Sequence, residues 1–319
     1  MLLTDDILRV LVCPECRAEL EERRDVVGCP NGHEFSSGGR VLDLLLTPKD
    51  PGVRATLESF GYEWTTFARI EPEDAIFWES YFRDVPLEEV ADALTLDAGC
   101  GKGRFTRFTA AQVRAIVAFD GSDAIVAASE NLADLANATC IRGDLVDPPF
   151  AESSFGFITC LGVLHHLPDP ANSLKLLARL LHPGGYLLLY VYSRPTRPGV
   201  RAVGLAVASF LRRLTTVVPR PTLRLFSAPL AFLLTLLFVF PGQLGERFGI
   251  EKLRRLPLAT YRQRPLRALW LDTFDRLSAP VEHRYSRPEL EAMLVDAGLD
   301  VEKVREQAGW FVVARRRQL

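Results

Sequence analysis

The stretch Leu96-Asp97-Ala98-Gly99-Cys100-Gly101-Lys102-Gly103-Arg104-Phe105 decides the fold of this 319-residue chain. A short apolar strand at 94–96 opens into a turn whose three glycines let a ligand approach the backbone without meeting a Cβ atom. A dinucleotide-binding turn would need a further glycine where Arg104 stands. Asp97 would repel a pyrophosphate, and it suits a ligand that carries a cationic amine instead.

Two more acids follow the next two predicted strands. Asp120 ends the strand 115–119, and Asp144 follows the strand 139–142. A carboxylate at position 120 can accept hydrogen bonds from both hydroxyls of a ribose, and one at 144 is placed to accept from an adenine amino group. Because ligands of open α/β sheets bind at the carboxyl ends of the strands, the three acids predict a site for adenosine bearing an amino acid.

The residues around these motifs alternate between short apolar runs and amphipathic runs. The pattern predicts strands at 155–161 and 186–192 and helices at 122–135 and 171–181, which indicates βαβ units and a parallel sheet. A helix from Arg287 to Gly298 and strands at 300–305 and 310–314 close the predicted fold.

Five segments occur in the order LDAGCGKGRF, AFDGSD, IRGDL, PFAESSFGFITCLGVLHHLPDP and LHPGGYLLLYVY. This order resembles the class I S-adenosylmethionine-dependent methyltransferases, closely over 93–192 and loosely over 287–315. The resemblance implies an α/β, Rossmann-like sheet of seven strands with an antiparallel last strand. It also implies that the cofactor is S-adenosylmethionine. The predicted cofactor-binding residues are Asp97, Gly99, Cys100, Gly101, Gly103, Asp120, Gly121, Ser122, Asp144, Leu145 and Leu161.

Two segments depart from the family pattern. The fourth strand begins Phe155-Gly156, where the family usually has Phe-Asp, so a common support is missing. Residues 147–150 read DPPF, the signature of amino-group methyltransferases, but they precede the fourth strand rather than follow it. We therefore interpret them as the loop that leads into that strand.

The N-terminal segment has the spacing of a metal site. Cys13 and Cys16 form one knuckle, and Cys29 and His33 form another after twelve residues. Three thiolates and one imidazole suit tetrahedral Zn²⁺, and four protein ligands leave no open position, so we expect a structural zinc site. The segment, through 41–44, resembles the zinc ribbon of bacterial rRNA guanine-N1 methyltransferases and the small zinc-ribbon activators of methyltransferases. We expect a ribbon over 1–46.

Composition excludes several classes of protein. Hydrophobic residues make up 48% of the chain and charged residues 24%, which excludes intrinsic disorder, and a net charge of -2 excludes a globally basic nucleic-acid binder. Clustered cysteines favour metal over disulfides, and the acidic start of the chain does not resemble a signal peptide. We expect a cytoplasmic protein.

The charge is strongly segregated, however. Residues 194–267 hold 13 arginines and Lys252 against two acids, a net charge of +12. They lie within an insert at 193–285 that divides the methyltransferase domain into 50–192 and 286–319. The run 230–240 has only Thr235 as a polar residue, and Pro229 and Pro241 bracket it. A run of 11 residues is too short to span a bilayer and suits an interfacial segment. The insert is therefore either a peripheral element at the anionic inner face of the membrane or a substrate lid.

The acceptor side offers three histidines and an aromatic segment. His165 and His166 follow the fourth strand, and His283 lies near the end of the insert. Each is a candidate base, although a backbone-pinning role for the adjacent pair and a solvated loop position for His283 are equally consistent with the sequence. The segment 60–67 contains four aromatic residues and is either a lid over the cofactor or a packing helix.

The sequence features leave three alternative hypotheses for the function. The first is O- or N-methylation of a small, hydrophobic or lipid-linked acceptor. The second is methylation of an RNA base, which the ribbon and the arginines favour, but these arginines alternate with Leu, Phe and Val rather than with stacking aromatics. The third is a ribbon scaffold or activator with a vestigial methyltransferase fold, which the intact glycine turn and three acids argue against.

Overall fold

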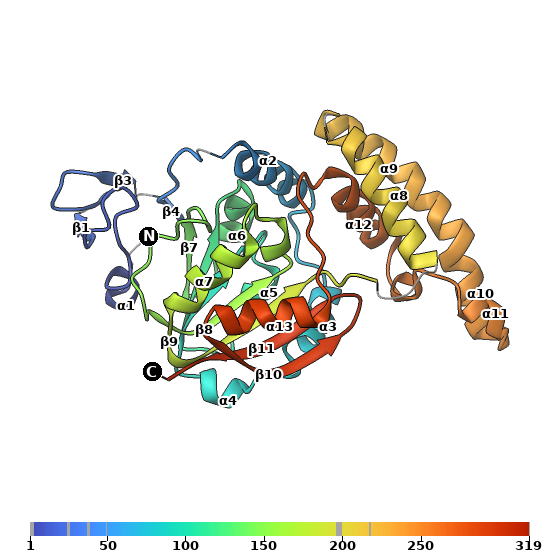
Figure 1. Ribbon diagram of the computed structural model, residues 1–319. Helices are drawn as coiled ribbons and strands as arrows, with labels where there is room; N and C mark the ends of the chain where they lie inside the picture. Colours follow the sequence, from blue (N-terminus) through green and yellow to red (C-terminus); the bar gives the residue numbers. More distant parts are fainter. Residues whose placement is uncertain are drawn as a thin grey trace. The chain divides into compact units, whose positions relative to one another are not determined.

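The computed structural model describes residues 3–23, 26–36, 39–48, 50–195, 200–216 and 218–318. The chain divides into two compact units, Met1–Arg194 with Val281–Leu319, and Pro195–Pro280. Each unit is described by itself below (Figure 1).

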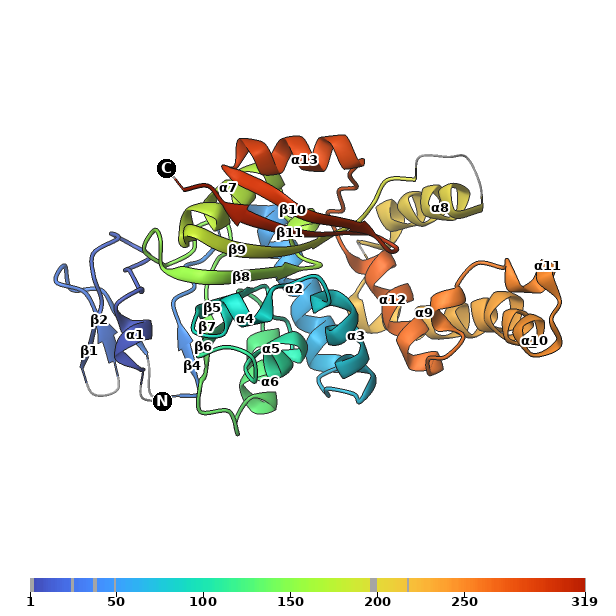
Figure 2. The ribbon, with the colours of Figure 1, turned by 90° about the horizontal axis from the view of Figure 1, so that it is seen from below.

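An eight-stranded sheet forms the centre of the first unit, with strand order β10-β11-β9-β8-β5-β6-β7-β4. Its strands are β4 (Val41–Asp43), β5 (Leu94–Ala98), β6 (Ala115–Asp120), β7 (Ala138–Arg142), β8 (Phe155–Leu161), β9 (Leu181–Val191), β10 (Leu299–Glu306) and β11 (Trp310–Arg316). The strands β4 to β9 are parallel, whereas β11 is antiparallel to both β9 and β10. Figure 2 shows β10, β11, β9 and β8 following one another. The predicted fold, with its antiparallel last strand, is confirmed.

The eighth strand is a correction to the predicted seven. Residues 41–44 were expected to belong to the N-terminal ribbon, but β4 pairs in parallel with β7, with Val41 opposite Cys140. Leu44 N–H extends the pairing by donating to Arg142 O at 2.8 Å. Leu42 is fully buried in the sheet's core, which explains why this short apolar run joins the larger sheet.

Helices cover both faces of the sheet. Those of the first unit are α1 (Asp5–Leu8), α2 (Pro51–Thr66), α3 (Glu73–Phe82), α4 (Leu87–Val90), α5 (Arg104–Thr109), α6 (Ala124–Asn131), α7 (Pro170–Leu180), α13 (Arg287–Asp296) and the 3-10 turn η1 (Leu164–His166). The helix α6 is shorter than the predicted 122–135. Its start is delayed because Ser122 gives both its N–H and its hydroxyl to Asp120, at 2.8 and 2.7 Å.

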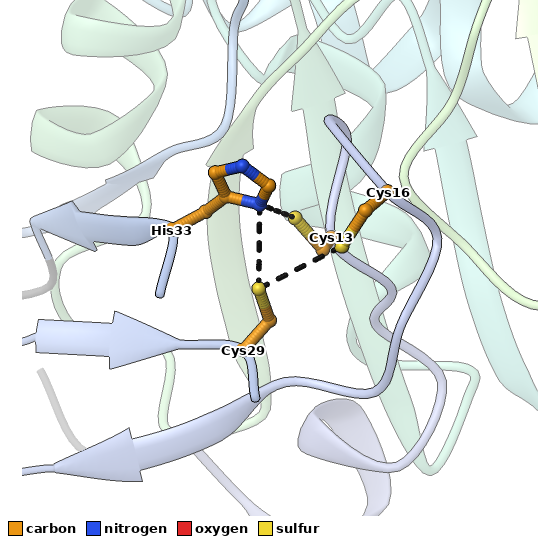
Figure 3. A group of neighbouring side chains, drawn as sticks. All are labelled: Cys13, Cys16, Cys29 and His33. Atoms are coloured by element: carbon orange, nitrogen blue, oxygen red, sulfur yellow. Dashed lines mark hydrogen bonds between the residues drawn. The ribbon is translucent and has the colours of Figure 1, made fainter. Parts of the chain in front are cut away.

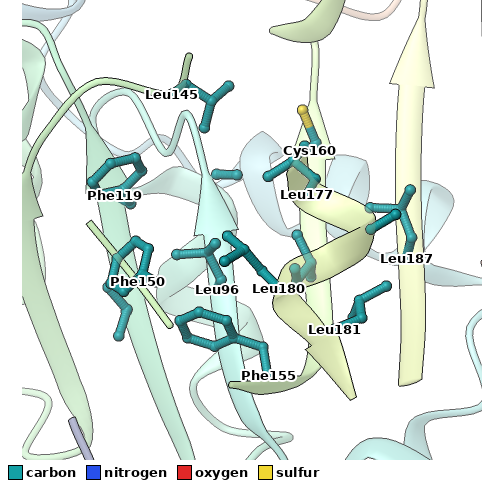
Figure 4. Packing of buried hydrophobic residues seen from close by; sticks show 14 of the residues in the cluster. Leu96, Phe119, Leu145, Phe150, Phe155, Cys160, Leu177, Leu180, Leu181 and Leu187 are labelled. Atoms are coloured by element: carbon teal, nitrogen blue, oxygen red, sulfur yellow. The ribbon is translucent and has the colours of Figure 1, made fainter. Parts of the chain in front are cut away.

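Alternation along the strands separates two core layers. Val117 and Phe119 of β6 pack on the side of α7 and α13, while Ile116, directly before Val117, packs on the side of α3 and α5. In α7 the buried leucines 174 and 177 follow the helical period, and they meet Leu96 and Phe155 in the first layer (Figure 4). Both faces of the central strands β5 and β6 are therefore buried, as expected of a parallel sheet.

A three-stranded antiparallel sheet, β1 (Glu21–Arg23), β2 (Val26–Gly28) and β3 (Glu34–Ser36), forms the N-terminal module. The segment before it attaches to the DPPF loop at 147–150. Val12 N–H donates to Pro149 O at 3.0 Å, and Ala151 N–H donates to Val10 O at 2.8 Å. Arg17 donates to Pro148 O and Phe150 O, both at 2.9 Å. The 147–150 loop, which resembles a catalytic signature, thus anchors the N-terminal module to the sheet.

The second unit is helical. Its elements are α8 (Val200–Thr215), α9 (Arg220–Leu234), the π-helical η2 (Thr235–Val239), α10 (Phe240–Phe248), α11 (Glu251–Arg254), the 3-10 turn η3 (Ala259–Tyr261) and α12 (Leu266–Ser278). Together α9, η2 and α10 form one helix, Arg220–Phe248, of 29 residues. The prolines that bracket the apolar run do not end the helix, because Pro229 lies inside α9 and Pro241 is the second residue of α10, after the wider π turn.

Replacing Arg17 by alanine should loosen the N-terminal module from the 147–150 loop. Two charged hydrogen bonds to carbonyls are lost, and about 1–2 kcal/mol of local stability should go with them. Hydrogen exchange at the amides of Val12 and Ala151 should speed up by about tenfold or more. The matched control is Arg9→Ala, because Arg9 is exposed. Equal exchange in both variants would contradict this account of docking.

Candidate functional site

The glycine turn begins where the fully buried strand β5 ends. Gly99, Gly101 and Gly103 all have positive φ, at 81, 55 and 77°. A Cβ atom on Gly99 would lie 2.4 Å from a methyl carbon of Val163, so only glycine fits there. The turn is therefore pressed closely against the segment that follows β8.

Asp120 supports this turn from the end of β6. Its Oδ2 accepts from Gly101 N–H at 2.9 Å, while its Oδ1 accepts the two bonds from Ser122. Burial raises the pKa of the Asp120 carboxyl, and the donors from Ser122 and Gly101 oppose that rise. Gly121 lies close to the next turn, because a Cβ on it would be 2.9 Å from Gly143 O.

Asp144 occupies the equivalent place after β7, the neighbour of β6 in the sheet. Its Oδ1 accepts from Val146 N–H at 3.0 Å, and burial raises the pKa of its carboxyl. Leu145 beside it and Leu161 at the end of β8 are both buried. The structure thus brings Asp120, Asp144 and the glycine turn to one edge of the sheet. Ribose and adenine recognition by these carboxylates stays a prediction.

Asp97 differs from the other two acids because it is almost completely buried, with 3% of its surface exposed. Its carboxylate accepts from Thr106 Oγ1 of α5 at 2.5 Å and from Thr159 Oγ1 of β8 at 2.8 Å. Asp97 therefore ties three elements together, a role that the sequence analysis missed. Thr106 lies near the start of the helix after the turn and could have been suspected, but no sequence signal marks Thr159.

Cys100 is buried within the turn, and its Sγ donates to Gly101 O at 3.6 Å. Burial raises the pKa of the Cys100 thiol well above its usual value, so this side chain is a neutral thiol at pH 7. At the site it can offer apolar surface rather than a nucleophile.

The aromatic segment 60–67, predicted to be either a lid over the cofactor or a packing helix, lies almost entirely in α2, a helix that packs against the turn. A Cβ on Gly101 would be 3.3 Å from the Trp64 indole, and one on Gly121 would be 3.0 Å from Leu57. The Arg104 guanidinium carbon lies 5.1 Å from the centre of the Trp64 ring. One helix therefore covers the ends of both β5 and β6.

The three predicted histidines meet beside the turn. His283 N–H donates to His165 O at 2.8 Å, and the His165 and His166 ring centroids are 4.2 Å apart. His166 bonds through Nδ1 to Val281 O at 2.6 Å, and its ring lies 4.8 Å from that of Phe60 in α2. His166 thus pins the backbone that returns from the insert.

His165 and His283 have unused polar atoms. Both ring nitrogens of His165 and Nε2 of His283 are buried without a hydrogen-bond partner in the described part of the chain. Burial lowers the pKa of His165 well below its usual value, so this imidazole is neutral at pH 7. Unsatisfied buried polar groups are costly, so these atoms need water or a bound ligand as partners.

Residues next to His283 complete this polar cluster, and the sequence analysis did not single them out. Arg284 forms an ion pair with Glu282 at 2.8 Å and lies 4.8 Å from the centre of the Tyr192 ring. The buried Tyr285 hydroxyl has no partner among the described residues. Four consecutive polar or aromatic residues, at the very end of the predicted insert, were the signal available in the sequence.

The four predicted metal ligands also converge (Figure 3). One ligand atom from each of Cys13, Cys16, Cys29 and His33 lies within 4.8 Å of the others. Cys13 and Cys29 Sγ are each 3.4 Å from His33 Nδ1, and Cys16 and Cys29 Sγ are 3.7 Å apart. Sulfur ligands of tetrahedral Zn²⁺ at about 2.3 Å would be about 3.8 Å apart, so the cluster fits this ion.

The surroundings of Cys16 favour a thiolate. The Ala18 backbone N–H and the Asn31 side chain, whose Nδ2 donates at 3.1 Å, lower the pKa of the Cys16 thiol to about 6. Donors to sulfur stabilise the charged form that a metal requires.

A family model described as a methyltransferase domain matches residues 96–189. The chain is 33% identical over 138 residues to a ubiquinone biosynthesis O-methyltransferase of Xanthomonas oryzae pv. oryzae, covering 42% of this chain and 55% of that one. It is 31% identical over 107 residues to a demethylmenaquinone methyltransferase of Staphylococcus aureus, covering 32% and 44%. The chain thus spans about half the length of these two relatives.

Among solved structures, the fold is similar to a Haloferax volcanii complex of the Trm112 methyltransferase activator with a methyltransferase. The TM-score is 0.50 at 14% identity, covering 85% of this chain and all of that one. At this identity the likeness concerns the fold alone. The family match begins at Leu96, so the resemblance of the N-terminal module to rRNA enzymes stays a prediction.

Proposed function

We infer from the class I S-adenosylmethionine-dependent methyltransferase domain at residues 96–189 that this protein methylates a small acceptor. The observation that carries the proposal is the glycine turn held by Asp120, with Asp144 after the neighbouring strand. S-adenosylmethionine, when bound, supplies an electrophilic methyl group on a sulfonium. The protein then has to bind and align the two reactants.

The chain's own residues divide this task. The Asp120 carboxylate keeps acceptor capacity for ribose hydroxyls, and Asp144 keeps it for the adenine amino group, since the hydrogen bonds that each carboxylate accepts use only part of its lone pairs. Leu145 and Leu161 offer apolar surface for the base. Asp97 sets the distance between the turn and β8 through Thr159.

For the acceptor we assign the cluster of His165, His283 and Tyr285. The neutral His165 imidazole can accept a proton from a hydroxyl, and His283 can orient the same group through Nε2. The rings of Phe60 and Tyr192 beside the histidines favour a planar, hydrophobic acceptor. The methylation of quinone precursors named for the two relatives supports an acceptor of this kind.

Replacing Asp120 by asparagine should weaken S-adenosylmethionine binding by about 10- to 100-fold. A charged hydrogen bond worth about 1.5–3 kcal/mol is lost, while the size of the side chain is kept. Isothermal titration calorimetry measures the change, with Asp134→Asn as the control at an exposed acid. Because Asp120 also holds the turn, Asp144→Asn provides a second test, since the one hydrogen bond of the Asp144 carboxylate among the described residues is to Val146 N–H. Unchanged affinity in both site variants would refute the assignment.

The methyl label from S-adenosylmethionine should enter the organic-soluble fraction of a cell extract. The Asp120→Asn variant gives the blank, and the label is counted separately in lipid extracts, small polar molecules and RNA. Labelled RNA would favour the alternative RNA base methyltransferase. If the protein binds no S-adenosylmethionine and labels no fraction, the scaffold interpretation with a vestigial fold replaces both.

The N-terminal module is proposed to hold one structural zinc ion through Cys13, Cys16, Cys29 and His33. The separations of their ligand atoms suit a tetrahedral ion, and four protein ligands complete its coordination. Zinc would organise β2, which ends just before Cys29, and β3, which begins just after His33. Both strands are too short to be stable alone.

The double variant Cys13→Ser, Cys16→Ser should lose the zinc that the wild-type chain binds at one ion per molecule. Serine hydroxyls are poor ligands for Zn²⁺ in place of thiolates, and elemental analysis by mass spectrometry measures the loss. Cys140→Ser makes the same chemical change outside the cluster and should keep the ion. S-adenosylmethionine affinity should change little, because the cluster shares no residue with the glycine turn. Stoichiometric zinc in the double variant would disprove the site.

A further inference from the structure

The long helix of the second unit, Arg220–Phe248, buries mainly small residues and exposes large apolar ones. Its packed face carries the small residues Ser227, Ala231, Gly242 and Gly245 together with Leu223 and Val239, all of which are buried. Trp270 of α12 covers this face and donates from Nε1 to Ser227 Oγ at 3.0 Å. The outward face carries the large apolar residues instead. They are Leu225, Phe226, Phe232, Leu233, Leu236, Leu237 and Phe240, which are 49–70% exposed.

The neighbouring helix α8 repeats this arrangement. Val207, Phe210, Leu211 and Leu214 are exposed at the spacing of a single helical stripe. Arg212, by contrast, is buried, and its Nε donates to Arg276 O of α12 at 3.2 Å. Arg262 is buried as well, bonded to Glu246 and to the carbonyls of Arg254 and Leu256. A helical unit in water would normally place leucine inside and arginine outside.

The polar residues around the stripes are mostly cations. Arg213, Arg247 and Lys252 are exposed. The two acids between residues 194 and 267 are both engaged, because Glu246 pairs with Arg262 and Glu251 pairs with Arg254 and Arg255. Exposed leucine and phenylalanine next to cations that have no acidic partner among the described residues match an anionic lipid surface in both apolar and electrostatic character.

Length alone would let the helix cross a bilayer. No charged residue occurs from 225 to 245, and 21 residues of helix measure about 31 Å, close to the hydrocarbon thickness. The expected 11-residue limit on the apolar segment was therefore wrong. Among the described residues, Arg220–Phe248 is the one helix that is long and apolar enough to cross.

The path of the chain argues against crossing. The insert leaves and returns at paired positions of the first unit, where Ser193 bridges Tyr285 and Arg194 N–H donates to Tyr285 O at 2.8 Å. A chain that returns to its starting side must cross a membrane an even number of times. The segment 249–280 contains ten charged residues, and so cannot provide the second span.

We propose that Pro195–Pro280 is a docking module that lies in the surface of an anionic phospholipid bilayer. The apolar stripes of α8 and of Arg220–Phe248 enter the boundary between headgroups and acyl chains. The packed face stays against α12, and the flanking cations contact the headgroups. This proposal does not depend on the proposed methyltransferase activity, although a lipid-soluble acceptor would be found at the same surface.

Flotation of the full-length protein with vesicles tests the proposal. Vesicles of phosphatidylcholine with about 30% phosphatidylglycerol should carry the protein upward, and pure phosphatidylcholine should carry less. Raising the salt concentration should weaken binding only in part, because the apolar contribution is not screened. If the wild-type protein floats with neither vesicle type, the proposal is overturned.

The decisive variant is Leu233→Ser, Leu236→Ser, Leu237→Ser, because these exposed side chains contribute little to the fold. It should reduce the vesicle-bound fraction about tenfold or more even at low salt. The matched control, Ile76→Ser, Val126→Ser, Val295→Ser, alters exposed apolar residues of the first unit and should bind as the wild type does. Equal binding by both triple variants would refute the docking face.

Two other occupants give distinct results. If a second copy of the chain covers the stripes, the wild type will dimerise without vesicles and the Leu233, Leu236, Leu237 variant will be monomeric. If RNA is the partner, binding will fall steeply with salt in proportion to the phosphates contacted and will not respond to the leucine substitutions. Either result, with no flotation, would replace the membrane proposal.

Discussion

Three backbone N–H groups of the glycine turn donate to β6, and the arrangement of the site depends on these bonds. Gly99 and Cys100 both donate to Phe119 O, at 2.7 and 3.1 Å, and Gly101 donates to the Asp120 carboxylate. The bonds hold the turn in the left-handed conformations that only glycine adopts cheaply. Because the turn is fixed, Val163 on one side and Trp64 on the other can pack against it.

The buried Asp97 carboxylate extends this organisation across the sheet. It joins β5 to α5 through Thr106 and to β8 through Thr159, so the turn and the segment carrying His165 keep a constant separation. Burial of a carboxylate is costly, and the two hydroxyl donors offset part of that cost. Alignment of two reactants requires such a frame, since in-line transfer depends on the distance between donor and acceptor sites.

The N-terminal module and the helical insert, the two additions to the methyltransferase domain, differ in how they place their apolar residues. The N-terminal module attaches through backbone hydrogen bonds and Arg17 to the 147–150 loop, and it shares a buried core with the sheet. The helical insert forms its own small core, around Ala231, Val239, Tyr261 and Leu269, and leaves the large apolar residues of the stripes on α8 and Arg220–Phe248 outside. The first arrangement is typical of a fixed part of a domain, and the second is suited to contact with a further apolar phase.

The sequence by itself determined the fold class, the glycine turn, the strand-end acids and the convergence of the four cluster residues. These features depend on local rules: glycine permits positive φ, apolar periodicity marks strands and helices, and two short knuckles bring their ligands together. Only the tertiary structure decided that Thr159 bonds Asp97, that residues 147–150 receive Arg17, and that β4 joins the large sheet. It also decided that the helix continues through Pro229 and Pro241 and turns its leucines outward. These outcomes join residues far apart in the chain, or depend on which face a neighbour covers, and no local pattern encodes either.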